Sequence, residues 1–194
     1  MNIVKNYLKI LNEAKSYKDG SMPNPYDYQS LELDEKVTRA DLKELDKFRK
    51  KMKKFEDPKT VNLSAKEWLY YEPPNFPGGE LGRKHEYHRT FTVVDNRKRV
   101  GIVSTTGSAY ILWSSWVPGF NYAVRGTMKM LEQLTEIKDW RYRQDSAVYT
   151  IIWHKNIPSI KVAKKLKMKL TGGTKKEEVA PSYMLDYPFW WIKK

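Results

Sequence analysis

The segment from Val148 to Leu170 constrains the fold more than any other part of the sequence. It reads VYTIIWHKNIPSIKVAKKLKMKL, in which an apolar run is followed by an Asn-Ile-Pro-Ser turn, a basic amphipathic stretch and a second apolar run. Asparagine is a favoured N-cap residue and proline suits the first turn of a helix. We therefore expect a helix over 158–167 behind Asn156, between strands at 147–153 and 168–170.

The rest of the chain shows similar local signals. Thr38 with Asp41, and Ser64 with Glu67, have the spacing of capping boxes, each at the start of a helix. Residues 88–105 alternate like a β-hairpin around a turn at 96–99. Apolar periodicity predicts helices over 3–16, 39–55 and 124–138, a short helix after Ser64, and strands over 108–117 and 181–192.

This order of elements predicts an α/β fold of mixed α+β type. Antiparallel strands at the front and alternating strands and helices at the back imply a twisted, mixed, mostly antiparallel sheet with helices on both faces. We expect a helical N-terminal extension over residues 1–60 and the sheet domain over residues 61–194.

Composition excludes several classes of protein. The chain has no cysteine, so it contains neither disulfides nor a cysteine-based zinc site. No apolar run approaches the roughly 20 residues that a membrane span needs. The N-terminus carries Lys5, Lys9 and Glu13 within its apolar pattern, unlike a secretory signal. We expect a soluble, cytoplasmic protein.

The net charge of +13 favours polyanionic partners, which include nucleic acid, anionic cofactors and acidic proteins. After residue 60 there are 22 basic and 12 acidic residues, so most of the excess lies there. The densest basic cluster is formed by lysines 161, 164, 165, 167, 169, 175 and 176. The alternative interpretation is an ordinary solvated, lysine-rich surface.

The element order and the Asn156 segment together resemble the GCN5-related N-acetyltransferase (GNAT) superfamily, over about Phe91 to Leu170. The helix after the fifth strand of that family reads Asn, two residues, Ala or Ser, three residues, Tyr, and then a turn into Gly-Phe. The corresponding residues here are Asn156, Ser159, Ala163 and Lys167-Met168, so the tyrosine and the glycine are missing.

The resemblance implies an N-acyltransferase that uses acetyl-CoA or another acyl-CoA, with the pantetheine arm paired to a splayed sheet edge. It implies phosphate binding at the turn 118–127, where the family carries Gln or Arg, two residues, Gly, one residue, and Gly or Ala. This chain has only Gly126 there. We expect the cofactor to contact Val117, Tyr122, Arg125, Gly126, Thr127, Asn156 and Ser159. The plainer alternatives are a first helical turn at Arg125-Gly126 and a simple cap at Asn156.

The catalytic residues are less clearly marked. Ala163 occupies the family's acid position and cannot protonate a thiolate. Tyr149, Tyr122 and Tyr183 are the candidate substitutes, and no sequence signal chooses between them. We assign the catalytic roles to Glu86, His88 and Tyr149. His85 and His88 also have a metal-ligand spacing, but with three histidines in the chain a surface pair is the better interpretation, and we expect no metal site.

A second function remains open from the residues alone. The missing family residues also fit a non-catalytic basic protein of the same fold that binds nucleic acid or an acidic protein. A third alternative is an acyl-CoA enzyme that modifies a nucleobase. The acceptor and the oligomeric state are not encoded in any motif.

Overall fold

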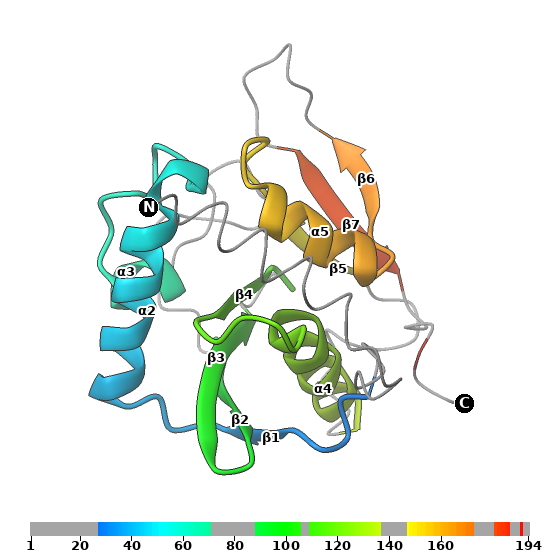
Figure 1. Cartoon of the computed structure of the whole chain (residues 1–194). Helices are drawn as coiled ribbons and strands as arrows, with labels where there is room; N and C mark the ends of the chain where they lie inside the picture. Colours follow the sequence, from blue (N-terminus) through cyan, green and yellow to red (C-terminus); the bar gives the residue numbers. More distant parts are fainter. Residues whose placement is uncertain are drawn as a thin grey trace, which may run out of the picture.

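The structure is a computed structural model that describes residues 27–70, 88–105, 109–136, 147–172, 181–186 and 191. Within them, the strands form two antiparallel sheets (Figure 1). The first has the order β1-β2-β3-β4, and the second has the order β5-β7-β6. The strands are β1 Glu32–Asp34, β2 Arg89–Asp95, β3 Lys98–Thr105, β4 Ile111–Ser115, β5 Ala147–Ile151, β6 Lys169–Gly172 and β7 Ser182–Asp186.

The helices lie on both sides of the first sheet. They are α2 Arg39–Met52, α3 Ala65–Leu69, α4 Tyr122–Glu136 and α5 Ile157–Lys165, and a 3-10 turn at Lys53–Phe55 follows α2. In Figure 1, α2 and α4 lie on opposite sides of the β2–β3 hairpin. Helix α5 shares the side of α4, because both helices contribute to the same buried cluster.

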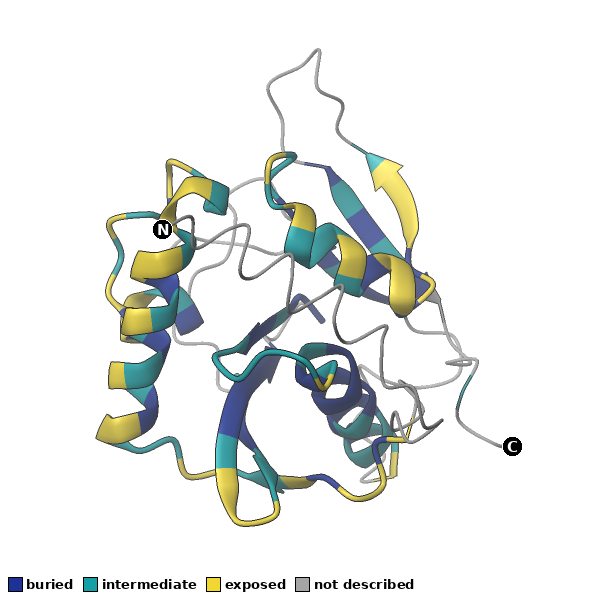
Figure 2. Cartoon of the chain, in the orientation of Figure 1, coloured by how far each residue is buried: buried dark blue, intermediate teal, exposed yellow. Residues whose placement is uncertain are grey.

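Each side of the first sheet has its own core. The larger core contains Val103 and Trp113 from the strands and Met128 and Leu131 from α4. The smaller core contains Leu45 of α2, Leu69 of α3 and Ile102 of β3. Because side chains alternate along a strand, neighbouring residues Ile102 and Val103 enter different cores. In Figure 2 most of β3 and much of α4 are coloured as buried.

Strand β1 and the turn before it belong to the same fold. Leu33 pairs with Val93 of β2, and the buried side chains of Tyr28 and Leu31 join the larger core. The Tyr28 hydroxyl donates to Glu132 Oε1 of α4 at 3.0 Å. Residues 27–34, which lie within the predicted N-terminal extension, therefore complete the core.

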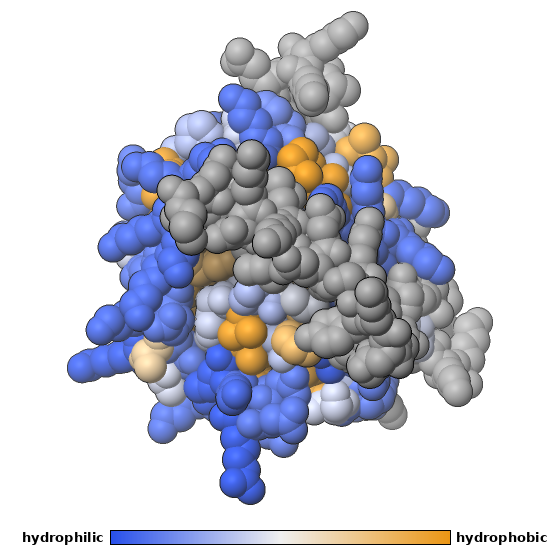
Figure 3. Space-filling model, in the orientation of Figure 1, coloured by the Kyte–Doolittle hydropathy of each residue, from blue (hydrophilic) through white to orange (hydrophobic). Residues whose placement is uncertain are grey.

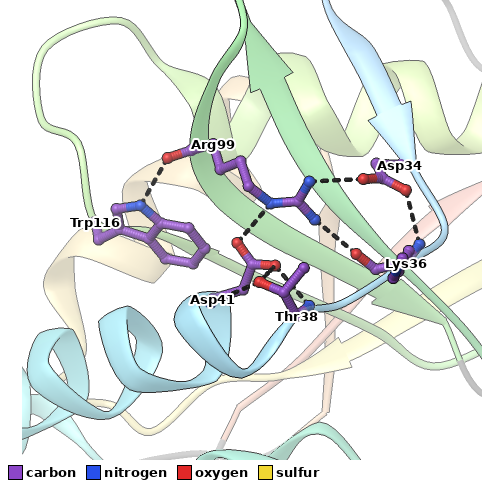
Figure 4. A network of polar contacts seen from close by, with 6 residues as sticks. All are labelled: Asp34, Lys36, Thr38, Asp41, Arg99 and Trp116. Carbon is purple, nitrogen blue, oxygen red and sulfur yellow. Dashed lines mark hydrogen bonds and ion pairs between the residues drawn. The ribbon is translucent and has the colours of Figure 1, made fainter.

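A partly buried ion-pair network joins β1, α2 and β3 (Figure 4). Arg99 Nε donates to Asp41 Oδ1 at 2.7 Å, and Nη1 donates to Asp34 Oδ2 at 2.6 Å. The backbone N–H and the hydroxyl of Thr38 both donate to Asp41 Oδ2 at 2.7 Å, which completes the capping box of α2. Trp116 Nε1 donates to the carbonyl of Arg99 at 2.9 Å and links the end of β4 to the network.

Most predicted elements are confirmed, including both capping boxes and the hairpin. The mixed sheet is confirmed in outline, but the described residues confine parallel pairing to one bridge between Tyr110 and Tyr149. Strand β1 was not predicted, because three residues carry too little alternation to mark a strand. The predicted helix over 3–16 lies outside the described residues.

None of the described helices is both long enough and apolar enough to span a bilayer.

Asp41→Asn is expected to lower the free energy of unfolding at pH 7 by about 2 kcal/mol, since it removes the charge of a buried carboxylate that pairs with the partly exposed Arg99. Burial alone would raise the pKa of Asp41, but hydrogen bonds from Arg99 and Thr38 outweigh it and hold this pKa below its ordinary value. Because the folded-state pKa is lowered, the ionised Asp41 stabilises the folded state at pH values above its unfolded-state pKa of about 3.9. This contribution is lost as the pH falls through the folded-state pKa.

Urea unfolding of wild type and Asp41→Asn between pH 7 and pH 3 measures this effect. The difference between the two proteins should be constant near neutral pH and shrink below about pH 4. Asp34→Asn removes the more exposed partner of the same Arg99 and should have a much smaller effect. Equal losses of unfolding free energy in the two variants would contradict the assignment of Asp41 as the stronger partner of Arg99.

Candidate functional site

The two sheets meet along the outer edges of β4 and β5. Both strands are terminal in their sheets, and Tyr110 and Tyr149 form a parallel bridge where the edges touch. The Tyr149 N–H donates to the carbonyl of Ala109 at 3.0 Å. No further β4–β5 ladder pair occurs among the described residues, so the strands separate as each runs toward its C-terminal end. An edge of this kind offers backbone N–H and C=O groups to an extended ligand.

A helix follows each of the two diverging strands. Helix α4 begins at Tyr122, and its first helical bond runs from the Arg125 N–H to the carbonyl of Asn121 at 2.9 Å. The amides of residues 121–124 therefore form the free first turn, which favours anions. Lys165 Nζ, at the end of α5, donates to Asn121 Oδ1. A basic side chain of α5 thus lies at the N-terminus of α4.

Asn156 caps α5 in the way the sequence predicts. Its Oδ1 accepts from the Ser159 N–H at 3.2 Å, and Pro158 lies in the first turn. At the other end, Lys167 has φ of 57°, and the Met168 N–H donates to the carbonyl of Ala163 at 3.0 Å. This left-handed residue occupies the position of the family's glycine. Ala163 itself is fully buried in the larger core.

The turn predicted to bind phosphate ends earlier in the sequence than expected. Because α4 begins at Tyr122, residues 125–127 lie inside the helix. Arg125 is 3 % exposed and donates to the carbonyl of Asp27 at 2.5 Å and to Ser30 Oγ at 3.0 Å. Thr127 Oγ1 donates to the carbonyl of Ala123 at 2.7 Å. Both side chains therefore have internal partners.

Gly126 serves the packing of α4 on the sheet. A Cβ at this position would lie 2.6 Å from Val93 Cγ2, closer than carbon atoms can approach. The glycine thus allows close contact between α4 and β2. Val117, the first of the predicted cofactor residues, is half-buried beside the larger core, and its carbonyl accepts from Ser115 Oγ at 2.8 Å.

The sheet face opposite α4 carries a polar cluster. His88 Nε2 lies 2.8 Å from Ser104 Oγ and 2.9 Å from Thr90 Oγ1, and the two hydroxyls are 3.0 Å apart. The ring of Tyr70, just after α3, packs on His88 with centroids 4.5 Å apart. Ser104 pairs with Leu112 of β4, so this residue of the cluster lies one strand spacing, about 5 Å, from the edge strand β4.

The three tyrosines considered as acids have different environments. The Tyr122 hydroxyl donates to Asp95 Oδ2 at 2.7 Å, and burial followed by this bond holds its pKa well above the ordinary value. Tyr183 is buried in the larger core, where burial raises its pKa. Tyr149 pairs with Tyr110, and strand alternation from Val148 of the larger core directs its side chain to the face that carries His88. Glu86 and His85 lie outside the described residues.

Several polar groups at this edge were not singled out from the sequence. Ser114 Oγ of β4 and His154 Nδ1, just after β5, are buried without a hydrogen-bond partner. The His154 ring packs on Trp153 at 4.0 Å between centroids. A serine within an apolar strand and a histidine directly before a helix cap were the available signals. Buried polar atoms without partners are uncommon. These two lie on or just after the edge strands, and Thr92 Oγ1 of β2 is another such atom away from the edge.

By sequence, no protein-family model and no curated protein matches the chain. Its fold, however, matches solved structures. A domain from Methanocaldococcus jannaschii superposes with a TM-score of 0.56 at 18% identity, over 80% of this chain and 97% of that one.

Two acetyltransferases match over similar lengths. The acetyltransferase from Agrobacterium tumefaciens gives a TM-score of 0.53 at 13% identity, over 81% of this chain and 91% of that one. The structure of AAC(6')-Ib in complex with ribostamycin and coenzyme A gives a TM-score of 0.50 at 13% identity, over 81% of this chain and 93% of that one. The chain thus has a GNAT-like acetyltransferase fold, and the predicted resemblance is confirmed at the level of the fold.

Proposed function

We propose that the chain is an acyl-CoA-dependent N-acyltransferase that transfers an acyl group, most simply acetyl, to an amine. The observation that supports this proposal is the bridge between Tyr110 and Tyr149, beyond which no ladder pair joins the two edge strands within the part of the chain that the structure describes. The pantetheine arm is an extended chain with two amides, and it can pair with such an edge as an added strand. The neighbouring N-terminus of α4 supplies amides for phosphate.

The residues fit this donor in a distinct way. We propose that the first-turn amides of residues 121–124 face the donor phosphate, together with the ammonium of Lys165 that also binds Asn121, in place of the predicted Arg125, Gly126 and Thr127. Asn156, at the start of α5 and at the end of the segment after β5, is proposed to contact the arm in addition to its capping role.

The reaction requires a nucleophilic amine and a protonated leaving group. The amine nitrogen bonds to the thioester carbonyl carbon, the C–S bond breaks, one amine proton passes to a base, and the thiolate takes up a proton. We assign the base to His88, acting with the hydroxyls of Thr90 and Ser104, and the acid to Tyr149. Glu86 is retained as a second candidate base.

Acetyl-CoA at millimolar concentration is expected to raise the melting temperature of the wild type, because a ligand that binds only the folded state stabilises it. Asn156→Ala should melt lower by itself, since loss of an N-cap costs about 1 kcal/mol. Asn156→Ser keeps a capping side chain but shortens it, so its own stability should be near wild type. Differential scanning fluorimetry with and without acetyl-CoA separates the two roles of Asn156.

If Asn156 contacts the donor, both variants should lose most of the shift produced by acetyl-CoA, although only the alanine variant is destabilised. If acetyl-CoA raises the melting temperature of Asn156→Ser as much as that of the wild type, Asn156 acts only as a helix cap. A wild type whose melting temperature does not respond to acetyl-CoA would contradict the proposed function.

Tyr149→Phe should lower kcat by about 10² while the KM for acetyl-CoA stays near wild type, because the hydroxyl acts on the leaving thiolate. Tyr183→Phe is the matched control: it removes the same hydroxyl from β7, the strand paired with β5, but on the core side. Thiol release across a panel of primary amines measures both variants. Equal rates in the two would exclude Tyr149 as the acid.

A further inference from the structure

The described surface of α5 and its flanking segments is rich in exposed lysines. The α5 lysine patch consists of exposed lysines, namely Lys155, Lys161, Lys164, Lys165, Lys167 and Lys169. The sequence contains no aspartate or glutamate between residues 147 and 172. Residues 109–131, which include the N-terminal part of α4, also contain none. In Figure 3, which has the orientation of Figure 1, blue hydrophilic residues cover much of the visible surface, with orange apolar patches among them.

The patch lies on the donor side of the proposed site. Lys165 binds Asn121 at the N-terminus of α4, and α4 and α5 pack on the same face of the sheets. The polar cluster of His88 and Ser104 lies on the opposite face, where β3 also meets α2. The lysines are therefore placed to act on whatever carries the thioester, and not on the acceptor amine.

The shape of the patch does not suit a small anion. Tight phosphate sites are concave and built from converging amides and side chains. Here the lysines project from a convex helix of nine residues, about 13 Å long, and continue onto β6. Arg125 and Gly126 would strengthen a pyrophosphate site, but Arg125 is hydrogen-bonded to Asp27 and Gly126 packs against Val93. Spread charge of this kind attracts and orients a large acidic partner.

Apolar side chains border the same lysines. Ile157 at the start of α5 is 46% exposed, Leu170 in β6 is 62% exposed, and Phe120 just before α4 is 39% exposed. Protein interfaces combine such apolar contacts with a charged rim. A nucleic-acid backbone would use the charges but not Ile157 or Leu170, so these residues favour a protein partner.

We propose that the α5 lysine patch docks an acidic carrier protein, whose phosphopantetheine arm delivers the acyl thioester between β4 and β5. This inference rests on the proposed function and names the preferred donor for the same site. The chemistry is unchanged: the amide C–N bond forms, the C–S bond breaks, and the protonated thiol remains on the carrier instead of on CoA. One phosphate on the arm then replaces the three phosphates of CoA.

The test compares binding of four ligands by isothermal titration: a purified acidic acyl carrier protein with its phosphopantetheine arm, the same protein without the arm, CoA, and a single-stranded oligonucleotide. The armed carrier should bind at least tenfold more tightly than CoA and than the carrier without the arm, and its affinity should fall with added salt. The double variant Lys161→Glu and Lys164→Glu should weaken carrier binding at least tenfold but change CoA binding less than twofold.

Lys43→Glu with Lys50→Glu makes the same change of charge on exposed positions of α2, away from the patch, and should leave carrier binding intact. Melting curves of both double variants confirm that they are folded. If CoA binds and the armed carrier does not, the inference is overturned while the proposed function stands. If neither binds, the proposed function fails as well.

Two further results would overturn the inference alone. Equal weakening of CoA and carrier binding by the patch variant would assign the lysines to the phosphates of CoA. Oligonucleotide binding that depends on Lys161 and Lys164, without carrier binding, would assign the patch to nucleic acid.

Discussion

Two sheet edges that touch at one residue pair and then separate are the constraint on which the rest of this structure depends. The pairing of Tyr110 with Tyr149 fixes where β4 and β5 meet, and no other ladder pair joins the two strands among the described residues. An open edge is normally a liability, because it can recruit another strand. In this chain a helix follows each of the two edge strands, and Lys165 of α5 donates to Asn121 at the N-terminus of α4.

Charged side chains as well as apolar contacts hold the helices on the sheet. Arg125 ties α4 to residues 27–30, and Arg99 ties α2 to β1 and β3 through Asp41. The hydrogen-bond partners of the buried Arg125 offset the cost of its burial, whereas Arg99 is partly exposed. Their positions explain why the basic residue closest to the expected phosphate turn is unavailable for phosphate. The exposed lysines of α5 supply positive charge on the same side of the sheets as α4, and both the proposed donor site and the proposed carrier interface rest on them.

Local signals in the sequence predicted much of the fold, because caps and alternation depend on neighbouring residues. Thr38, Ser64 and Asn156 all cap helices as expected. The start of α4 was predicted two residues late, since Asn121 adopts a left-handed backbone that no sequence pattern announced. That shift placed residues 125–127 at a phosphate turn when they lie inside the helix. The contact between His88 and Ser104 depends on strand pairing across 16 residues, so only the structure could reveal it.

Hydrogen exchange measured by mass spectrometry, with and without a saturating, non-transferable thioether analogue of acetyl-CoA, tests most directly whether the acyl donor lies between β4 and β5. We predict slower exchange in peptides that cover residues 111–117, 121–125 and 149–157, and unchanged exchange in α2. Unchanged exchange in those three segments, or slower exchange only in α2 and α3, would contradict the proposal that the acyl donor lies between β4 and β5.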